Sequence, residues 1–165
     1  MGDIVARKPR IHMLVGLPRS GKTTYCNYYL GRIPVFSADT FRYLVYNQKF
    51  WAGGEETMWA VHDIAIINLL KQRIDVVVDE TNTTKKCRKK YVDLAQMYGY
   101  ELEAVVISTA PGICLERAGK DETLKGVIHR MSQQWEPVSR EEGIDSIKII
   151  NLGGGIENAE PDYTP

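Results

Sequence analysis

Residues 16–23 read Gly16-Leu17-Pro18-Arg19-Ser20-Gly21-Lys22-Thr23 and fit the pattern G-x-x-x-x-G-K-[ST]. An apolar run at residues 10–15 lies directly before them and predicts a strand, whereas residues 23–30 predict a helix. The two glycines allow the backbone to bend so that successive N–H groups point inward, and the helix start adds free N–H groups and a positive dipole. We therefore expect this stretch to hold the phosphates of a nucleoside triphosphate and to determine the fold.

The pattern also gives individual residues of this loop separate roles. Lys22 is expected to reach the β- and γ-phosphates, and the Thr23 hydroxyl is expected to hold Mg²⁺. The predicted nucleotide-binding set in this stretch is Gly16, Leu17, Pro18, Arg19, Ser20, Gly21, Lys22, Thr23 and Thr24. An ordinary glycine turn before a helix is the alternative, but a strand before the glycines and a helix after them favour phosphate binding.

The composition is typical of a globular protein of one domain. Apolar residues make up 44% of the 165 residues and charged residues 25%, and no apolar run approaches the ~20 residues of a membrane span. Residues 1–9 lack the apolar stretch of a secretory signal. Cys26, Cys87 and Cys114 are odd in number and widely spaced, which predicts reduced core residues of a cytoplasmic protein.

The charge balance limits the kind of nucleic-acid contact that we expect. The chain has 21 Lys and Arg residues and 21 Asp and Glu residues, so its formal net charge is zero. This balance counts against an extended footprint on duplex DNA or RNA. A protein that holds only one strand end needs no more than a local cluster of cations.

Strand and helix patterns alternate along the chain. The predicted strands are residues 10–15, 33–37, 74–79, 102–107 and 147–150, and the main predicted helices are residues 23–30, 55–72, 85–98, 111–118 and 127–135. No hairpin signal joins adjacent strands, so the predicted fold class is α/β, a three-layer P-loop NTPase fold with a five-stranded parallel sheet flanked by helices. A polar connection at residues 119–126 predicts a small, flexible lid. Ligands of such sheets bind beyond the carboxyl ends of the strands, where we expect Gly16, Asp39, Asp79 and Ser108.

Three side chains near this edge are candidates for chemistry. Asp79 ends an apolar strand, as a Walker B acid does, and is predicted to bind Mg²⁺, with Glu80 as the weaker alternative. Asp39 is either a general base for an acceptor hydroxyl or a plain helix N-cap, and the spacing alone does not separate the two roles. Arg42 lies one helical turn further on and either binds a phosphate of the acceptor or only pairs with Asp39.

The predicted lid carries two further cations. Arg117 lies just before this segment and Lys120 at its start, where a closing lid would bring them to the transferring phosphoryl group. Solvated surface charge is the alternative. The neighbouring Asp121 and Glu122 weaken the electrostatic case for Lys120.

Several of these segments together resemble the kinase domain of the 5′-hydroxyl polynucleotide kinases of phages and animals. They are GLPRSGKT, SADTFR at 37–42, VVDETN at 77–82, ERAGK at 116–120 and IHRM at 128–131, and the resemblance covers residues 10 to about 136. It implies that Lys22 and Thr23 bind ATP with Mg²⁺, that Asp39 is the general base, and that Arg42 grips the phosphate after the terminal nucleoside. Arg117 matches the first lid arginine of the family, but where a second arginine is expected this chain has Lys120-Asp121.

The resemblance leads to one functional prediction with two alternatives. We expect a kinase domain over residues 1–152, a disordered tail over residues 153–165, and ATP-dependent phosphorylation of the 5′-hydroxyl end of DNA or RNA. The protein could be phage-encoded. A P-loop kinase of a small metabolite, nucleoside or nucleotide-sugar is the first alternative, and a nucleotide-dependent binding module without transfer activity is the second.

Two other stretches have a possible use on a nucleic-acid substrate. The basic residues at 85–90 could flank the backbone of the acceptor strand, or they could form a solvated helix face. Phe50 and Trp51 could stack on a base, or they could be partly buried loop residues.

Overall fold

The computed structural model describes residues 7–152, and within them five strands form one sheet. Every paired strand runs parallel, in the order β2-β3-β1-β4-β5, which confirms the predicted P-loop NTPase fold. The strands are β1 (Arg10–Val15), β2 (Val35–Phe36), β3 (Val76–Val78), β4 (Glu101–Ile107) and β5 (Ser146–Ile150). β2 and β3 are shorter than predicted. The predicted disordered tail at 153–165 lies outside the described residues.

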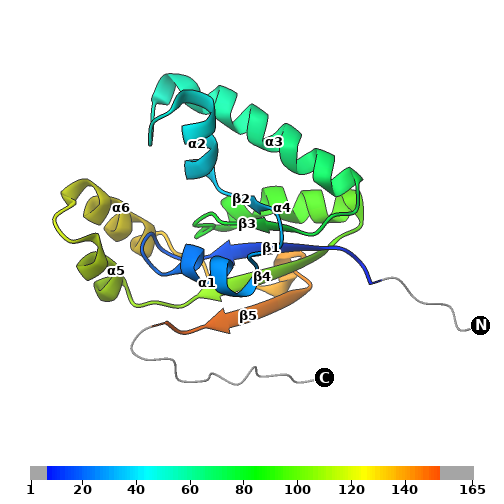
Figure 1. Ribbon diagram of the computed structural model, residues 1–165. Coiled ribbons are helices and arrows are strands. Elements are labelled where there is room, and N and C mark those ends of the chain that lie inside the picture. The colour runs from blue at the N-terminus through cyan, green and yellow to red at the C-terminus, as the bar shows by residue number, and fades with distance from the viewer. Residues whose placement is uncertain (1–6, 153–165) are drawn as a thin grey trace, which may run out of the picture.

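Helices connect the strands and pack on both sides of the sheet. They are α1 (Lys22–Tyr29), α2 (Ala38–Tyr46), α3 (Glu55–Lys71), α4 (Lys85–Tyr98), α5 (Pro111–Ala118) and α6 (Glu122–Gln133), with short 3-10 turns η1 (Ala52–Gly54) and η2 (Arg140–Glu142). In Figure 1, α3 and α4 lie on one side of the sheet and α1 on the other. This is the three-layer arrangement that alternating strands and helices predict.

The two faces of the central strand β1 belong to different core layers. Met13 packs in a buried cluster with Ile66 of α3 and Tyr91 of α4, whereas Leu14 packs in a second cluster with Tyr25 of α1. Successive side chains of a strand point to opposite faces, and a strand covered on both faces is therefore apolar throughout. The parallel pairing brings the carboxyl ends of β1, β3 and β4 to one edge of the sheet. In Figure 1 this edge is at the left, where α5 and α6 lie.

The lid differs from its predicted form. Residues 119–126 were expected to be a flexible connection, but α6 already begins at Glu122, so only residues 119–121 join the two helices. The Asp121 side chain accepts a hydrogen bond from the backbone N–H of Leu124 at 2.9 Å and caps this helix. Ile128 of α6 is fully buried in a third cluster with Cys114 of α5 and Leu17 of the glycine loop. Apolar packing therefore ties both helices to the loop.

The surface corrects one expectation about the cysteines. Cys26 and Cys114 are buried, but Cys87 is exposed near the start of α4 and is not a core residue.

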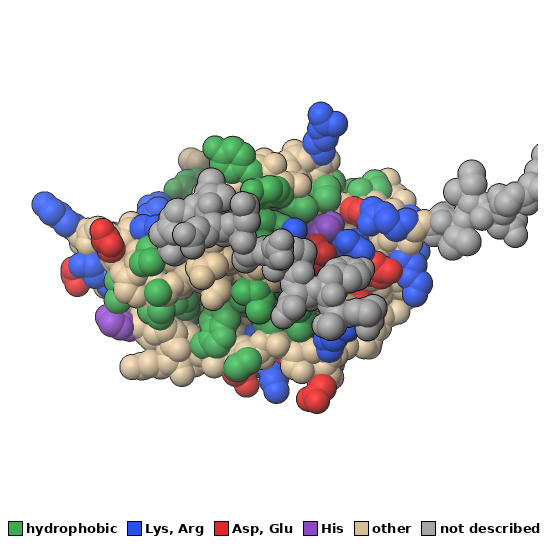
Figure 2. Space-filling model, turned by 90° about the horizontal axis from the view of Figure 1, so that it is seen from below, with side chains coloured by type: hydrophobic (Ala, Val, Ile, Leu, Met, Phe, Trp, Pro, Cys, Tyr) green, Lys and Arg blue, Asp and Glu red, His purple; other side chains and the backbone are tan. Residues whose placement is uncertain are grey.

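Among the described residues, no helix combines the length and apolarity that a bilayer crossing requires. Figure 2 shows the molecule from below, where apolar side chains gather near the middle of the face and most charged side chains lie toward its rim.

Candidate active site

The glycine loop is held open by its own backbone and by the segment after β3. A Cβ atom on Gly16 would lie 2.7 Å from the Ser20 hydroxyl oxygen and 3.2 Å from the carbonyl oxygen of Ile107, so no side chain fits at this position. Gly21 has a φ angle of 106°, which favours glycine, and it begins α1 as the N-cap. The N–H group of Gly16 donates to the carbonyl oxygen of Thr81 at 2.9 Å. The loop therefore has the close-fitting backbone that a phosphate-binding loop requires.

Lys22 lies inside the loop. Its ammonium group donates to the carbonyl oxygens of Gly16 at 3.0 Å and Leu17 at 2.8 Å, and its side chain is buried. Burial lowers the pKa of Lys22, whereas the nearby carboxylates of Asp79 and Asp39 raise it. Asp79 also contacts Thr23, the residue after Lys22, so this carboxylate lies next to the loop.

The two predicted magnesium ligands are in direct contact. The Thr23 hydroxyl donates to a carboxylate oxygen of Asp79 at 2.7 Å, and the N–H group of Asp79 donates to the carbonyl oxygen of Phe36 at 2.8 Å. One hydroxyl and one carboxylate fit a magnesium ion that also binds water and phosphate oxygens. Within residues 7–152, no three His, Cys, Asp or Glu side chains form a metal site by themselves. The donor set therefore suits a metal that arrives with a nucleotide.

Asp39 and Arg42 contact each other on α2. Asp39 is the second residue of α2, whose N-cap is Ser37, and its side chain is 81% exposed. One oxygen of Asp39 accepts a hydrogen bond at 2.9 Å from Nη1 of Arg42. The plain N-cap interpretation of Asp39 therefore does not describe its position. Pairing with Arg42 does describe it, and leaves the second carboxylate oxygen for another donor.

Glu55 orients Arg42 and was absent from the predicted site. It is the first residue of α3, and its two carboxylate oxygens accept from Nε and Nη2 of Arg42, both at 2.8 Å. The Tyr46 hydroxyl donates to the same carboxylate. The hydrogen bonds from Arg42 lower the pKa of Glu55 to about 2, and the Glu55 partner raises the pKa of Arg42. The only sequence signal for Glu55 is an acid in the first turn of a helix, and it does not name a partner.

Glu80 follows Asp79 in the chain and contacts the start of α2. Its carboxylate accepts a hydrogen bond at 2.6 Å from the backbone N–H of Ala38, the first residue of α2. Burial raises the pKa of Glu80 to about 7. The Ser37 side chain makes no capping hydrogen bond. Glu80, which belongs to the segment after β3, instead accepts the hydrogen bond of a backbone N–H group at the start of α2. The sequence analysis gave Glu80 as the weaker alternative to Asp79 for binding Mg²⁺, whereas in the structure its carboxylate contacts α2.

The two predicted lid cations differ in their contacts. Nη1 of Arg117 donates to the carbonyl oxygens of Arg19 at 3.2 Å and Ser20 at 3.3 Å, so this arginine lies against the glycine loop. Lys120 is exposed in the connection between α5 and α6 and makes no ion pair with another residue in 7–152. The structure thus brings Arg117, but not Lys120, to the phosphate-binding loop.

The basic run at 85–90 does not form one uniform surface. Arg88 is fully buried, and its guanidinium donates to both carboxylate oxygens of Glu142 at 2.8 and 2.9 Å and to the Asn82 carbonyl at 3.0 Å. Lys90 contacts Asp63 of α3. Arg88 therefore forms an ion pair with Glu142 that holds α4 to η2. It is not available for a nucleic-acid strand.

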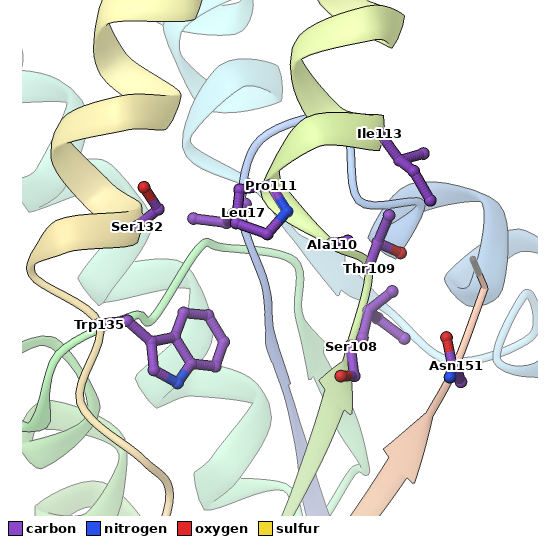
Figure 3. Close-up of a pocket in the computed structure, with 10 residues that line it drawn as sticks. Leu17, Ser108, Thr109, Ala110, Pro111, Ile113, Ser132, Trp135 and Asn151 are labelled. Carbon is purple, nitrogen blue, oxygen red and sulfur yellow. The ribbon is translucent and has the colours of Figure 1, made fainter.

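A cavity of about 560 Å³ adjoins the loop on the lid side (Figure 3). It lies between α5, α6 and the ends of β4 and β5, and Ser108, which was predicted at this edge, lines it. The lining residues are Leu17, Ile107, Ser108, Thr109, Ala110, Pro111, Ile113, Ser132, Trp135 and Asn151. None of these ten residues is charged. The cavity therefore suits an uncharged part of a ligand, unlike the neighbouring loop.

Sequence comparison identifies a family for most of the chain. The model of the family AAA_33, described as an AAA domain, matches residues 11–132. No curated protein sequence matches the chain.

Solved structures with the same fold come from several kinds of protein. A candidate kinase from Chloroflexus aurantiacus is 11% identical with a TM-score of 0.69, and the match covers 90% of both chains. A chain of the Pnkp1/Rnl/Hen1 complex is 23% identical with a TM-score of 0.62, over 70% of this chain and 41% of that one. A chain of the PezAT toxin-antitoxin system of Streptococcus pneumoniae is 19% identical with a TM-score of 0.64, over 88% of this chain and 68% of that one. At these identities the likeness establishes a shared fold, and this chain spans less than half of the Pnkp1-complex chain.

Proposed function

Because the chain belongs to the AAA_33 family of AAA domains, we propose that it is a P-loop phosphotransferase that moves the γ-phosphate of ATP to the 5′-hydroxyl end of a polynucleotide. The observation that carries this proposal is the Asp39–Arg42 pair beside the nucleotide-binding loop. A protein that only binds a nucleotide has no need of an exposed carboxylate next to an arginine that a second acid orients. The likeness to a chain of an RNA repair complex supports the same acceptor.

The donor side of the proposed reaction uses the loop, Lys22 and Thr23. Backbone N–H groups of the loop and the Lys22 ammonium would bind the phosphates, since both are positive groups in a buried setting. Thr23 and Asp79 would hold magnesium, which supplies positive charge that offsets the charge of the phosphates when it is bound. Arg117 lies against the loop backbone and would donate its remaining N–H groups to the transferring phosphoryl group.

The acceptor side uses Asp39, Arg42 and Glu55. The free carboxylate oxygen of Asp39 would accept the proton of the 5′-hydroxyl as its oxygen attacks the γ-phosphorus, and the bond from the γ-phosphorus to ADP breaks. Glu55 occupies the Nε and Nη2 edge of the Arg42 guanidinium. The edge between Nη1 and Nη2 then faces the phosphate that follows the terminal nucleoside, because a guanidinium presents its donors in a fixed plane.

The test compares acceptors in one assay. The protein is incubated with γ-labelled ATP and Mg²⁺ beside a 5′-hydroxyl oligonucleotide, a nucleoside 3′-phosphate and a plain nucleoside. We expect label on the oligonucleotide and on the 3′-phosphate, since both place a phosphate at Arg42. Label on the nucleoside alone would identify a small-molecule kinase. ATP binding without label on any acceptor would identify a binding module.

A small phosphorylated acceptor is the second candidate, and the charges around Arg42 favour it. Arg42 is the only basic side chain that contacts Asp39 or Glu55 among the described residues. An extended strand usually meets several cations, and the chain as a whole has no net charge. In the same assay, label on the nucleoside 3′-phosphate with none on the oligonucleotide would identify this candidate.

A further inference from the structure

We propose that Phe50 and Trp51 form a stacking platform for the base of the second nucleotide of the acceptor, one phosphate away from the reacting 5′-hydroxyl. This inference rests on the proposed function and names a ligand site that the family match does not assign. The ligand class is a single-stranded nucleic-acid end of at least two nucleotides.

The platform begins with two large aromatic side chains that face solvent. Phe50 is 64% exposed and Trp51 is 52% exposed, and both lie in the segment between α2 and η1. Tyr43 and Leu44 of α2 are exposed as well. Adjacent exposed apolar side chains on a soluble domain commonly mark a binding surface.

The Trp51 indole packs closely on Gly53, Gly54 and Tyr46. A Cβ atom on Gly53 would lie 2.9 Å from the indole ring, and a Cβ atom on Gly54 would lie 2.7 Å from it. Tyr46 packs edge-on against the same ring, with the centroids 5.8 Å apart at 83°. A side chain at either glycine would thus displace the indole from this position. An exposed ring that is packed in this way is prepared for stacking, because binding costs little additional conformational entropy.

Hydrogen bonds and ring contacts join this platform to the acceptor side of the active site. The guanidinium carbon of Arg42 lies 5.7 Å from the centre of the Phe50 ring, and Tyr46, which packs on Trp51, donates to the Glu55 carboxylate that orients Arg42. Asp39 lies on the other flank of Arg42, at 2.9 Å from Nη1. The order of groups is therefore Asp39, then Arg42, then the aromatic rings.

This order matches the order of groups along a strand. If the 5′-hydroxyl is at Asp39 and the next phosphate is at Arg42, then the base that follows this phosphate reaches the aromatic rings. Stacking on an aromatic ring accepts any base, since every base has a π-face. The platform therefore selects for length and for single-stranded character, and not for sequence.

The test measures KM for acceptors of different length in four variants. Phe50→Ala and Trp51→Ala remove one ring each, Phe50→Leu keeps apolar volume without a π-face, and Leu44→Ala removes a neighbouring exposed apolar side chain. We expect each alanine variant at 50 and 51, and Phe50→Leu, to raise the KM for a 5′-hydroxyl oligonucleotide about tenfold or more. The KM for a nucleoside 3′-phosphate stays unchanged, because this acceptor ends before the platform. Leu44→Ala behaves as the wild type.

An abasic oligonucleotide supplies a second, independent readout. When the second nucleotide lacks its base, the wild type and the Phe50→Ala variant should have the same KM. Without this base the Phe50 ring has nothing to stack on, so its removal has no further effect. The proposal is overturned if the oligonucleotide KM does not change in either alanine variant, or if the KM for the 3′-phosphate rises equally. It is also overturned if Phe50→Leu equals the wild type while Leu44→Ala weakens binding, which would indicate an apolar docking surface for a protein.

A binding assay separates failure of the platform from failure of the proposed function. Tryptophan fluorescence is followed while the oligonucleotide is added without ATP, with Trp51→Phe as the control that keeps a ring but removes the reporter. Quenching that disappears in Trp51→Phe supports the platform even if the wild type transfers no phosphate to any acceptor. Absence of quenching in the wild type rejects the platform whatever the transfer assay shows.

Discussion

Two glutamates beside Asp39 have pKa values that are shifted in opposite directions. Hydrogen bonds from Arg42 hold the pKa of Glu55 at about 2, whereas burial raises the pKa of Glu80 to about 7. Glu55 is therefore ionised near neutral pH, and its carboxylate holds the guanidinium of Arg42. Glu80 is the group whose charge changes near neutral pH.

Asp39 is the residue on which the proposed reaction depends most. Asp39→Ala is expected to lower kcat at least ~10²-fold, because general base catalysis is usually worth about 10² to 10⁴ in rate. The affinity for ATP should change little, since the hydrogen bond of Asp39 is to Arg42 and not to the glycine loop. Asp39→Asn is the matched control, because it retains an oxygen for Arg42 but removes the basic group. Wild-type kcat in both variants would remove Asp39 from the mechanism.

Glu80 makes stability depend on pH. Its folded pKa of about 7 lies above the ordinary value of 4.5, so the native state binds this proton more tightly than the unfolded state. The resulting stabilisation is complete below the ordinary value and is lost as the pH rises through 7. Glu80→Gln cannot ionise, and its carbonyl oxygen still accepts from Ala38. Relative to the wild type, this variant should gain stability as the pH is raised from about 5 to about 8, as thermal unfolding measures.

The control for Glu80 is an alanine substitution. Glu80→Ala leaves the Ala38 N–H group without its acceptor and should lose stability at every pH. A difference between Glu80→Gln and the wild type that stays constant with pH would contradict the prediction.

At the scale of elements, α2 and the α5–α6 pair are positioned by contacts from other segments. Glu80 holds the start of α2, and Glu55 of α3 holds its middle through Arg42. α5 and α6 are attached to the glycine loop through Leu17 and Arg117. The Asp39–Arg42 pair and Arg117 are thus carried by two separate helical units, each attached to other segments by its own contacts.

The start of α6 depends on one cap. Asp121→Ala removes the acceptor for the Leu124 N–H group and is expected to lower the free energy of unfolding by about 1 kcal/mol. Urea denaturation measures this difference. Asp121→Asn is a matched control, since asparagine caps helices about as well as aspartate. An alanine variant as stable as the wild type would show that the cap does not contribute.

At the scale of the whole molecule, the parallel sheet brings distant segments to one edge. Thr23 and Asp79 are 56 residues apart in the chain, and their side chains are 2.7 Å apart. The pairing of β1 with both β3 and β4 produces this arrangement, since parallel strands end on the same side. A ligand that contacts several of these segments at once should therefore raise the free energy of unfolding of the whole domain.

Nucleotide binding should accordingly raise the stability of the protein. ATP with Mg²⁺ at one hundred times its Kd is expected to add about 2.7 kcal/mol to the free energy of unfolding, which thermal unfolding detects as a higher Tm. Lys22→Ala should abolish most of this increase, because Lys22 is the buried cation of the loop. Lys71→Ala, at an exposed position at the end of α3, should keep it. An equal ATP-dependent increase in the Lys22 variant would exclude the loop as the nucleotide site.

The fold was largely predictable because its signals are local. The glycine pattern, the apolar strands and the helix at 85–98 each depend on neighbouring residues, and the parallel sheet followed from their alternation. The start of α6 was wrong by five residues, since the Asp121 cap and the packing of Ile128 outweighed the two glycines in that segment. Cys87 was wrongly placed in the core because helical spacing does not fix how deep a helix is buried.

The sequence alone determined the glycine loop, the alternation of strands and helices, and the positions of Asp39 and Asp79 just after strands, because these follow from spacing along the chain. Tertiary structure alone decided the partners of the charged groups. Arg42 binds Glu55, Glu80 binds the start of α2, and a carboxylate from η2 neutralises the buried Arg88. Such pairs join segments that are far apart in sequence, and a charge is buried only where folding brings a partner within hydrogen-bonding distance.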